Sequence, residues 1–89
     1  MSDLTADEVQ RIIKDEWLTA TANWYGPTGR NSLSAWIDRD GDEWVVWEAD
    51  ERAGQYNFRR YRSEAEALGT FLGLARGYKR GDSNAVRRI

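Results

Sequence analysis

The chain contains neither cysteine nor histidine. Without cysteine it forms neither a disulfide nor a zinc–thiolate site, so the sequence carries no sign of its redox compartment. Without histidine it lacks the commonest general base and the commonest transition-metal ligand. No apolar run approaches the length of a membrane-spanning helix, and the acidic segment 1–10 differs from a secretory signal peptide. We therefore expect a cytoplasmic protein.

Aromatic residues, by contrast, are abundant: five tryptophans, four tyrosines and two phenylalanines among 89 residues. Together with a hydrophobic content of 40%, this composition indicates a small folded protein rather than a disordered chain. A chain of this length builds one hydrophobic core. We predict a single domain over residues 1–80 and a polar, flexible tail over residues 81–89.

The charges are unevenly distributed, although they nearly cancel to a net −2. Residues 1–55 carry twelve acidic and five basic residues, whereas residues 56–89 carry three acidic and eight basic ones. Seven of the acidic residues lie within segment 38–51. Such a polarity steers a protein towards charged partners but does not specify its fold.

The N-terminal segment has the pattern of a capped amphipathic helix. Thr5 and Glu8 fit a capping box, in which each side chain accepts a hydrogen bond from a backbone N–H at the helix start. Apolar residues then recur at helical spacing, at Val9, Ile12, Ile13 and Trp17. We expect the helix to end between Trp17 and Asn23, with Trp17 in the core. Segment 24–31 holds two glycines and a proline and is predicted to be a loop.

Three strand-like segments follow, and they comprise residues 32–37, 43–49 and 55–61. Asp40-Gly41 predicts a tight two-residue turn between the first two segments, which pairs Ile37 with Trp44. The second hairpin is predicted to place Gly54 at the left-handed position of its loop.

This pairing sorts the side chains of the predicted sheet into two faces. Trp44 falls on the face that the helices cover, whereas Trp36 and Trp47 stand on the opposite face. Two large aromatics on a solvent-facing sheet mark a contact surface, unless the loop 24–31 or the tail covers them.

The second hairpin has a less consistent pattern. Its predicted register places Arg59 across from Trp47 and places Phe58 across from Glu48 on the covered face. A carboxylate on that face needs a basic partner at the sheet margin or a polar pocket.

The last helix repeats the capping pattern of the first, with Ser63 and Glu66 at the box positions. Gly69, Gly73 and Gly77 lie along one side of this helix, and each interior glycine costs about 1 kcal/mol relative to alanine. We expect a tryptophan or the first helix to approach closely there, unless Gly77 is the C-cap. Together the elements predict an α+β fold in the order α-β-β-β-α, a three-stranded antiparallel meander with both helices packed on one face.

Asp38, Asp40 and Asp42 alternate in the manner of a calcium-binding loop. That loop requires glycine at its sixth position and glutamate at its twelfth, where this chain has Glu43 and Ala49. We therefore predict no metal site and interpret the aspartates as solvated residues around a turn.

Catalysis by paired carboxylates is a second possibility, because Glu48 and Asp50 share a strand face. It requires a concave pocket that shifts one pKa, and an open three-stranded sheet offers little concavity. A serine nucleophile would lack its histidine partner, and segment 26–29 lacks the continuation of a phosphate-binding loop. We predict that the protein is not an enzyme and has no cofactor.

Segment 36–76 resembles the small immunity proteins of bacterial polymorphic-toxin and contact-dependent inhibition systems. The shared pattern is a strand, an Asp-Gly turn, a Trp-containing strand with acidic positions, and a third strand whose last aromatic leads into a Ser-Glu-rich helix. The matching residues are Asp40, Gly41, Trp44, Glu48, Tyr61, Ser63, Glu64, Ala67 and Phe71. The resemblance implies a cytoplasmic, non-enzymatic antitoxin that binds a cognate toxin and blocks its active site.

Such a role requires a surface that covers a basic cleft. An acidic hairpin with nearby tryptophans supplies electrostatic steering and buried anchors together. The predicted partner-binding residues are Trp36, Asp38, Asp40, Asp42, Glu43, Trp47, Glu48 and Arg59.

Basic and aromatic residues interleave in segment 56–62, which indicates an alternative: a nucleic-acid-associated or regulatory module that uses the third strand and the tail. The acidic residues of segment 38–51 would repel a phosphate backbone, which makes nucleic acid the weaker prediction. An acidic phage-encoded decoy, whose carboxylates imitate a phosphate backbone, is a further alternative.

Overall fold

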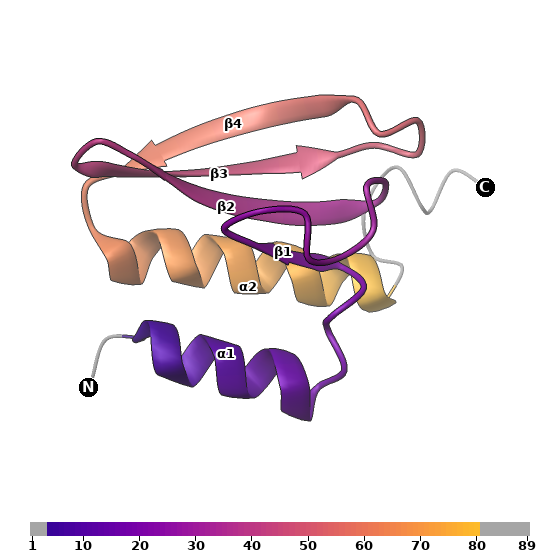
Figure 1. The fold of residues 1–89 in the computed structure, drawn as a ribbon, viewed down its shortest axis with the longest axis horizontal. Helices are drawn as coiled ribbons and strands as arrows, with labels where there is room; N and C mark the ends of the chain where they lie inside the picture. Colours follow the sequence, from indigo (N-terminus) through magenta and orange to yellow (C-terminus); the bar gives the residue numbers. More distant parts are fainter. Residues whose placement is uncertain (1–3, 81–89) are drawn as a thin grey trace.

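The computed structural model describes residues 4–80, which form an α+β fold with two helices and a four-stranded mixed sheet. Figure 1 shows the sheet above the two helices. The elements are α1 (Ala6–Asp15), β1 (Ala22–Trp24), β2 (Ser34–Asp40), β3 (Glu43–Ala49), β4 (Gln55–Tyr61) and α2 (Glu64–Arg80). The predicted tail at 81–89 lies outside the described residues. None of the helices within 4–80 has the length and apolarity that crossing a membrane requires.

Helix α1 begins as predicted but ends differently. Thr5 and Glu8 form the complete capping box. The helix ends at Asp15, and the backbone then turns through Trp17, which adopts a left-handed φ of 59°. The prediction that Trp17 lies in the core is wrong, because its side chain is 79% exposed and the next residue, Leu18, is buried instead.

The sheet has one strand more than the predicted meander. Strand β1 pairs in parallel with β2, with Ala22 opposite Ala35 and Trp24 opposite Ile37. The strands lie in the order β1-β2-β3-β4, so β1 and β4 are the two edges. The loop predicted for segment 24–31 therefore begins one residue later, after β1 has joined the sheet.

A buried asparagine holds the loop between β1 and β2. The Asn23 side chain donates to the carbonyl oxygen of Arg30 and to the hydroxyl of Ser34, both at 3.1 Å. Its carbonyl oxygen accepts from the backbone N–H of Gly29 at 2.7 Å. These bonds satisfy the buried amide and fold the loop back on the sheet, because an unpaired amide there would be destabilising.

The hairpin of β2 and β3 turns at Gly41-Asp42 rather than at Asp40-Gly41. Asp40 and Glu43 are the last paired residues, and Gly41 has a φ of 65°. Glycine at the first central position suits a two-residue hairpin turn of this kind. The predicted pairing of Ile37 with Trp44 is therefore wrong.

The shift moves every pairing by two positions, so each side chain keeps its predicted face. Ile37 lies opposite Val46, and Trp44 lies opposite Arg39, whose guanidinium carbon is 4.4 Å from the centre of the tryptophan ring. Trp44 faces the helices and packs against the core, as predicted.

The hairpin of β3 and β4 departs further from prediction. In its loop the left-handed residue is Ala53, with a φ of 66°, and not Gly54. A carboxylate oxygen of Asp50 organises this loop by accepting from the backbone N–H groups of Arg52 at 2.9 Å and Gly54 at 2.7 Å. Within β4, Asn57 is also left-handed, with a φ of 61°, and the register shifts there as in a β-bulge.

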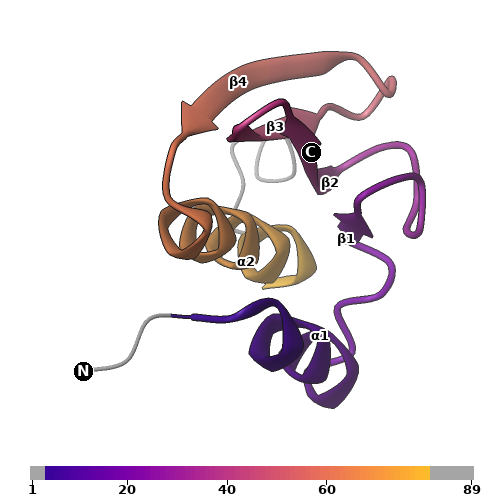
Figure 2. The same cartoon turned by 60° about the vertical axis from the view of Figure 1, so that its left-hand side comes forward.

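Both helices lie on one side of the sheet, as predicted. Figure 2 shows α2 directly beneath the strands, and α1 farther away beneath α2. The core between these layers comprises Val9, Ile13, Leu18, Ala22, Ala35, Ile37, Val46, Ala67, Leu68, Phe71, Leu72 and Ala75. The predicted close approach at the α2 glycines is wrong, because a methyl group at Gly69, Gly73 or Gly77 would meet nothing within 4 Å.

Candidate partner-binding surface

Three aromatic rings form a stacked row across the sheet face that points away from the helices. Trp36 on β2 lies directly opposite Trp47 on β3, with ring centroids 5.7 Å apart and ring planes at 15°. Phe58 on β4 continues the stack, 5.4 Å from Trp47 and at 22°. We call these three residues the aromatic row. The row runs across the strands, so β2, β3 and β4 each contribute one ring.

The bulge at Asn57 brings Phe58 into the row. Val46 pairs with Arg59 on one side of the bulge, and Glu48 pairs with Tyr56 on the other, so two residues of β4 span the single residue Trp47. Because the extra residue reverses the alternation, Phe58 joins Trp47 and Arg59 turns to the opposite face. The predicted placement of Arg59 beside Trp47 and of Phe58 beside Glu48 is therefore wrong.

The aromatic row is incompletely buried. Phe58 is 57% exposed, and Trp36 and Trp47 are partly buried. The indole nitrogens of both tryptophans are buried and have no hydrogen-bond partner among the described residues. A buried donor without an acceptor typically costs about 1–3 kcal/mol. This face therefore combines exposed apolar area with polar groups that are not satisfied within residues 4–80.

Charged residues of both signs flank the row at the β2–β3 turn. Arg60 lies 2.8 Å from Asp40 and 3.4 Å from Glu43, and Arg62 lies 3.8 Å from Glu43. The contact with Asp40 raises the pKa of the Arg60 guanidinium. The turn is consequently a mixed-charge flank and not the purely acidic hairpin of the prediction.

Two of the acidic residues stand apart from this network. Asp38 and Asp42 are exposed, and neither forms an ion pair within residues 4–80. A carboxylate oxygen of Asp38 accepts from the backbone N–H of Arg39 at 2.7 Å. These two side chains carry the uncompensated negative charge beside the row.

Glu48 lies on the opposite, helix-covered face and is only 6% exposed. Its carboxylate accepts hydrogen bonds from the Tyr78 hydroxyl and the Asn57 amide, both at 2.8 Å, and it pairs with Arg59 at 3.4 Å. Because Tyr78 donates to the carboxylate, Tyr56 donates to Tyr78, with the two hydroxyls 3.0 Å apart. The predicted basic partner and the predicted polar pocket are thus both present.

The environment of Glu48 also alters the titration of Tyr78. Burial, followed by its hydrogen bonds to Tyr56 and Glu48, raises the pKa of the Tyr78 hydroxyl well above its usual value. The phenol stays protonated because ionisation would place a second negative charge beside the carboxylate. The Glu48 carboxylate is satisfied, whereas one guanidinium nitrogen of Arg59 is buried without a hydrogen-bond partner among the described residues. The cluster lies apart from the aromatic row.

The structure thus divides the predicted partner-binding residues into two groups. Trp36, Asp38, Asp40, Glu43 and Trp47 share the helix-free face, and Asp42 lies in the adjoining turn. Glu48 and Arg59 belong to the other face. Phe58 was missed, and the signal that could have found it is Asn57, since asparagine is one of the few residues that readily adopts a left-handed conformation in mid-strand.

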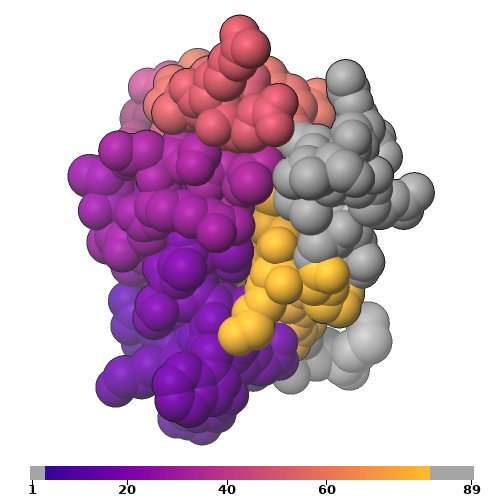
Figure 3. Space-filling model, turned by 90° about the vertical axis from the view of Figure 1, so that its right-hand side faces the viewer, coloured from indigo at the N-terminus to yellow at the C-terminus, as the bar shows by residue number. Residues whose placement is uncertain are grey.

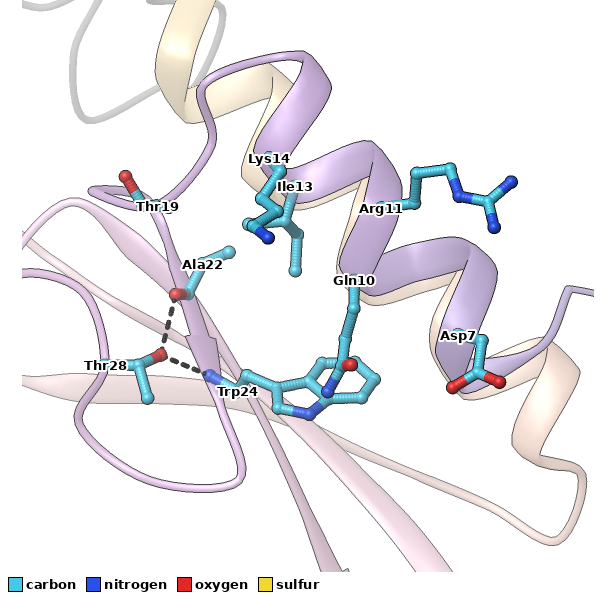
Figure 4. Close-up of a pocket in the computed structure, with 9 residues that line it drawn as sticks. All are labelled: Asp7, Gln10, Arg11, Ile13, Lys14, Thr19, Ala22, Trp24 and Thr28. Atoms are coloured by element: carbon cyan, nitrogen blue, oxygen red, sulfur yellow. Dashed lines mark hydrogen bonds between the residues drawn. The ribbon is translucent and has the colours of Figure 1, made fainter.

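A separate groove of roughly 490 Å³ lies between α1 and β1. Figure 4 shows the Trp24 indole on its inner wall, with the Gln10 side chain extended over the ring. The Thr28 hydroxyl accepts from the backbone N–H of Trp24 at 2.7 Å and donates to the carbonyl of Ala22 at 3.1 Å. Among the described residues that line the groove, Asp7 alone is acidic, and Figure 4 shows Arg11 pointing away from it. The groove therefore gathers no pair of carboxylates suited to acid–base chemistry.

The arrangement defines a class of domain: a four-stranded mixed sheet with two helices on one face and a stacked aromatic row on the other. In comparisons with known proteins, no family model, curated protein or solved structure matches the chain.

Proposed function

We propose that the domain is a non-enzymatic protein-binding module, an immunity protein that binds and neutralises a cognate bacterial toxin. The observation that carries the proposal is the aromatic row on the helix-free face of the sheet. Trp36, Trp47 and Phe58 form a continuous apolar strip there, and Phe58 is more than half exposed. Exposed aromatic clusters of this kind supply the anchors of protein interfaces.

The flank of the row supports a partner with basic residues. Asp38 and Asp42 offer uncompensated carboxylates, while Arg60 pairs with its own acidic neighbours. A partner with a basic rim around an apolar cleft would place its cations on the two aspartates and its apolar wall on the row. Exposed charges of this sort accelerate encounter, whereas the buried aromatics determine the lifetime of the complex.

The geometry favours a protein over a nucleic acid at this face. The tryptophan rings stack on each other at 5.7 Å, so no base fits between them, and only the ends of the row offer a free ring face. The arginines of β4 also form ion pairs within the fold: Arg59 with Glu48, and Arg60 with Asp40 and Glu43. The same arginines interrupt the series of carboxylates that a phosphate-mimicking decoy would need.

The proposal predicts a toxin gene beside the gene for this chain, and the test is binding to, and protection from, the toxin domain that such a gene encodes. We expect a stoichiometric complex by calorimetry and loss of toxin activity when the two proteins are mixed. Phe58→Asp should weaken the complex about 10-fold or more, because it places a charge among apolar contacts. Asp42→Arg should mainly slow association and reduce its salt dependence.

Trp17→Ala is the matched control, since it removes another exposed aromatic at a different place in the fold. It should leave toxin affinity unchanged. The proposal fails if the wild-type protein leaves the toxin active, or if Phe58→Asp binds as tightly as wild type.

A further inference from the structure

Trp17 occupies a position that favours glycine. After α1, the backbone N–H of Leu18 donates to the carbonyl of Ile13 at 2.8 Å, and that of Trp17 donates to the carbonyl of Lys14 at 3.3 Å. This pair of bonds is the Schellman motif, whose left-handed residue is usually glycine. Here it is a tryptophan with a φ of 59° that is 79% exposed. A bulky residue in this conformation is strained, and such strain is concentrated at functional sites.

The exposed indole lies beside a groove at the C-terminal end of α2. The groove has a volume of roughly 450 Å³ and is lined by Trp17, Ala20, Thr21, Arg30, Leu33, Tyr78, Lys79 and Arg80. We call it the basic groove, because three lining residues are cationic and none is acidic. Figure 3 faces this end of the molecule, where the end of α2, in yellow, meets the purple N-terminal segment. Leu33 is a second left-handed residue there, with a φ of 48°.

Two of the three cations donate to backbone carbonyls, and the pKa of nearby Glu16 is lowered by its hydrogen bond to Arg76 and also by the charges of Arg80 and Lys79. The Lys79 ammonium donates to the carbonyl of Trp17 at 2.9 Å, and the Arg30 guanidinium donates twice to the carbonyl of Leu33, at 3.2 and 3.0 Å. Neither Lys79 nor Arg30 pairs with a carboxylate in the part of the chain that the structure describes. Cations in the last helical turn also stabilise the helix dipole. None of this explains an exposed tryptophan at a glycine position.

We propose that the basic groove binds single-stranded nucleic acid, with a base stacked on the indole of Trp17 and the adjoining phosphates held by Lys79 and Arg30. Unlike the rings of the aromatic row, the Trp17 ring stacks on no other aromatic side chain in residues 4–80. A free ring face next to cations is the arrangement that holds single strands without sequence preference. The acidic β2–β3 turn lies at the opposite end of the sheet, as Figure 1 shows, so its repulsion of phosphate is screened. The nearer acids are engaged: Glu16 pairs with Arg76 at 2.6 Å, and the Asp50 carboxylate accepts from the backbone N–H groups of Arg52 and Gly54.

The experiment is a fluorescence anisotropy titration of labelled oligo(dT) and oligo(rU) with the whole protein, at low and at physiological ionic strength. We expect binding that weakens as salt rises. Trp17→Gly should reduce affinity about 5- to 100-fold, the range expected for the loss of one stacked base. Lys79→Gln should lower the slope of log affinity against log salt by about one unit.

Trp17→Gly also separates loss of binding from loss of folding. Glycine adopts the left-handed conformation without strain, so the melting temperature of this variant should equal or exceed that of wild type. The matched control is Phe58→Ala, which removes an aromatic from the other surface and should bind the oligonucleotides as wild type does.

Three results would overturn the inference: no anisotropy change at low salt, equal affinity of Trp17→Gly and wild type, or displacement of the oligonucleotides by poly-glutamate with equal potency. The last would identify the groove as a site for acidic peptides. Because Phe58 lies elsewhere, failure of oligonucleotide binding and failure of toxin binding are independent results.

Discussion

The two faces of the sheet differ in how their polar groups are hydrogen-bonded and how far their apolar groups are buried. On the helix-covered face, the carboxylate of Glu48 is buried, yet Tyr78, Asn57 and Arg59 satisfy it. On the helix-free face, the aromatic row is partly exposed while two of its indole N–H groups are buried without partners in residues 4–80. The Glu48 carboxylate is therefore satisfied within the fold, although one guanidinium nitrogen of Arg59 beside it is buried without a partner in residues 4–80. The other face combines unpaired donors with exposed apolar area, so it gains most from a partner.

The largest effect that would test this contrast is expected at Glu48. Glu48→Ala leaves a buried tyrosine hydroxyl, an amide and a guanidinium without their common acceptor, and should lower the free energy of unfolding by about 2–4 kcal/mol. Urea denaturation measures it. Asp42→Ala, which removes the same charge from the β2–β3 turn, should change stability by less than about 0.5 kcal/mol. Equal losses of unfolding free energy in the two variants would contradict the contrast between the two faces.

The neighbouring arginines of β4 give a matched pair, since consecutive strand residues point to opposite faces and the bulge places Arg59 on the covered one. Arg59→Ala removes a partner of buried Glu48 and should cost about 1 kcal/mol, measured by urea denaturation. Arg60→Ala removes only exposed ion pairs with Asp40 and Glu43, so its denaturation midpoint should shift less. A larger shift for Arg60→Ala would show that the turn's charges contribute more to stability than its exposure implies.

Alkaline pH tests the covered face through the ionisation of Tyr78. The pKa of Tyr78 is raised in the folded protein by burial and by its hydrogen bonds to Tyr56 and Glu48, whereas an unfolded tyrosine titrates near 10. Below pH 10 both states hold the proton and the stabilisation is complete. Above that pH the unfolded state loses the proton first, so stability falls as pH rises. Tyr78→Phe should flatten this decline in thermal melts between pH 9 and about 11; an unchanged slope would assign the decline to other groups.

A small stability change is expected at the aromatic row on the helix-free face. Phe58→Ala removes a half-exposed ring and should cost about 1 kcal/mol or less, mostly from the lost stacking on Trp47. Calorimetric melting of the free protein measures this. The contrast between the two faces is supported if Phe58→Ala costs far more free energy in toxin binding than in folding. It is contradicted if the loss in folding free energy is the larger one.

Local signals in the sequence predicted much of the fold. Thr5 and Glu8 defined the start of α1, and alternation assigned Trp36, Trp44 and Trp47 to their faces even though the turn was misplaced. The predicted register was wrong by two positions, and a shift by an even number leaves every side chain on its predicted face. Strand β1 was missed because three residues, Ala22–Trp24, are too few to show alternation, and its parallel pairing arises only from tertiary contacts.

The errors at the candidate sites share a cause. Arg59 and Phe58 exchanged faces because one left-handed residue, Asn57, shifts the phase of β4, and no periodicity within the strand reveals such a shift. Trp17 matched the apolar spacing of α1, but the helix ended two residues before it. A periodic pattern predicts the face of a side chain only as long as the helix or strand continues. Trp17 lies just beyond the end of α1, and Phe58 lies at the bulge of β4.

The bulge at Asn57 has a further consequence for solubility. Strand β4 is a free edge of the sheet, and a flat edge with unpaired backbone groups is a template on which other chains add strands and aggregate. Here the left-handed residue Asn57 breaks the regular spacing of those groups, and two charged arginines follow Phe58 along the same strand. The residue that turns an aromatic ring towards a partner thereby also deters uncontrolled strand addition.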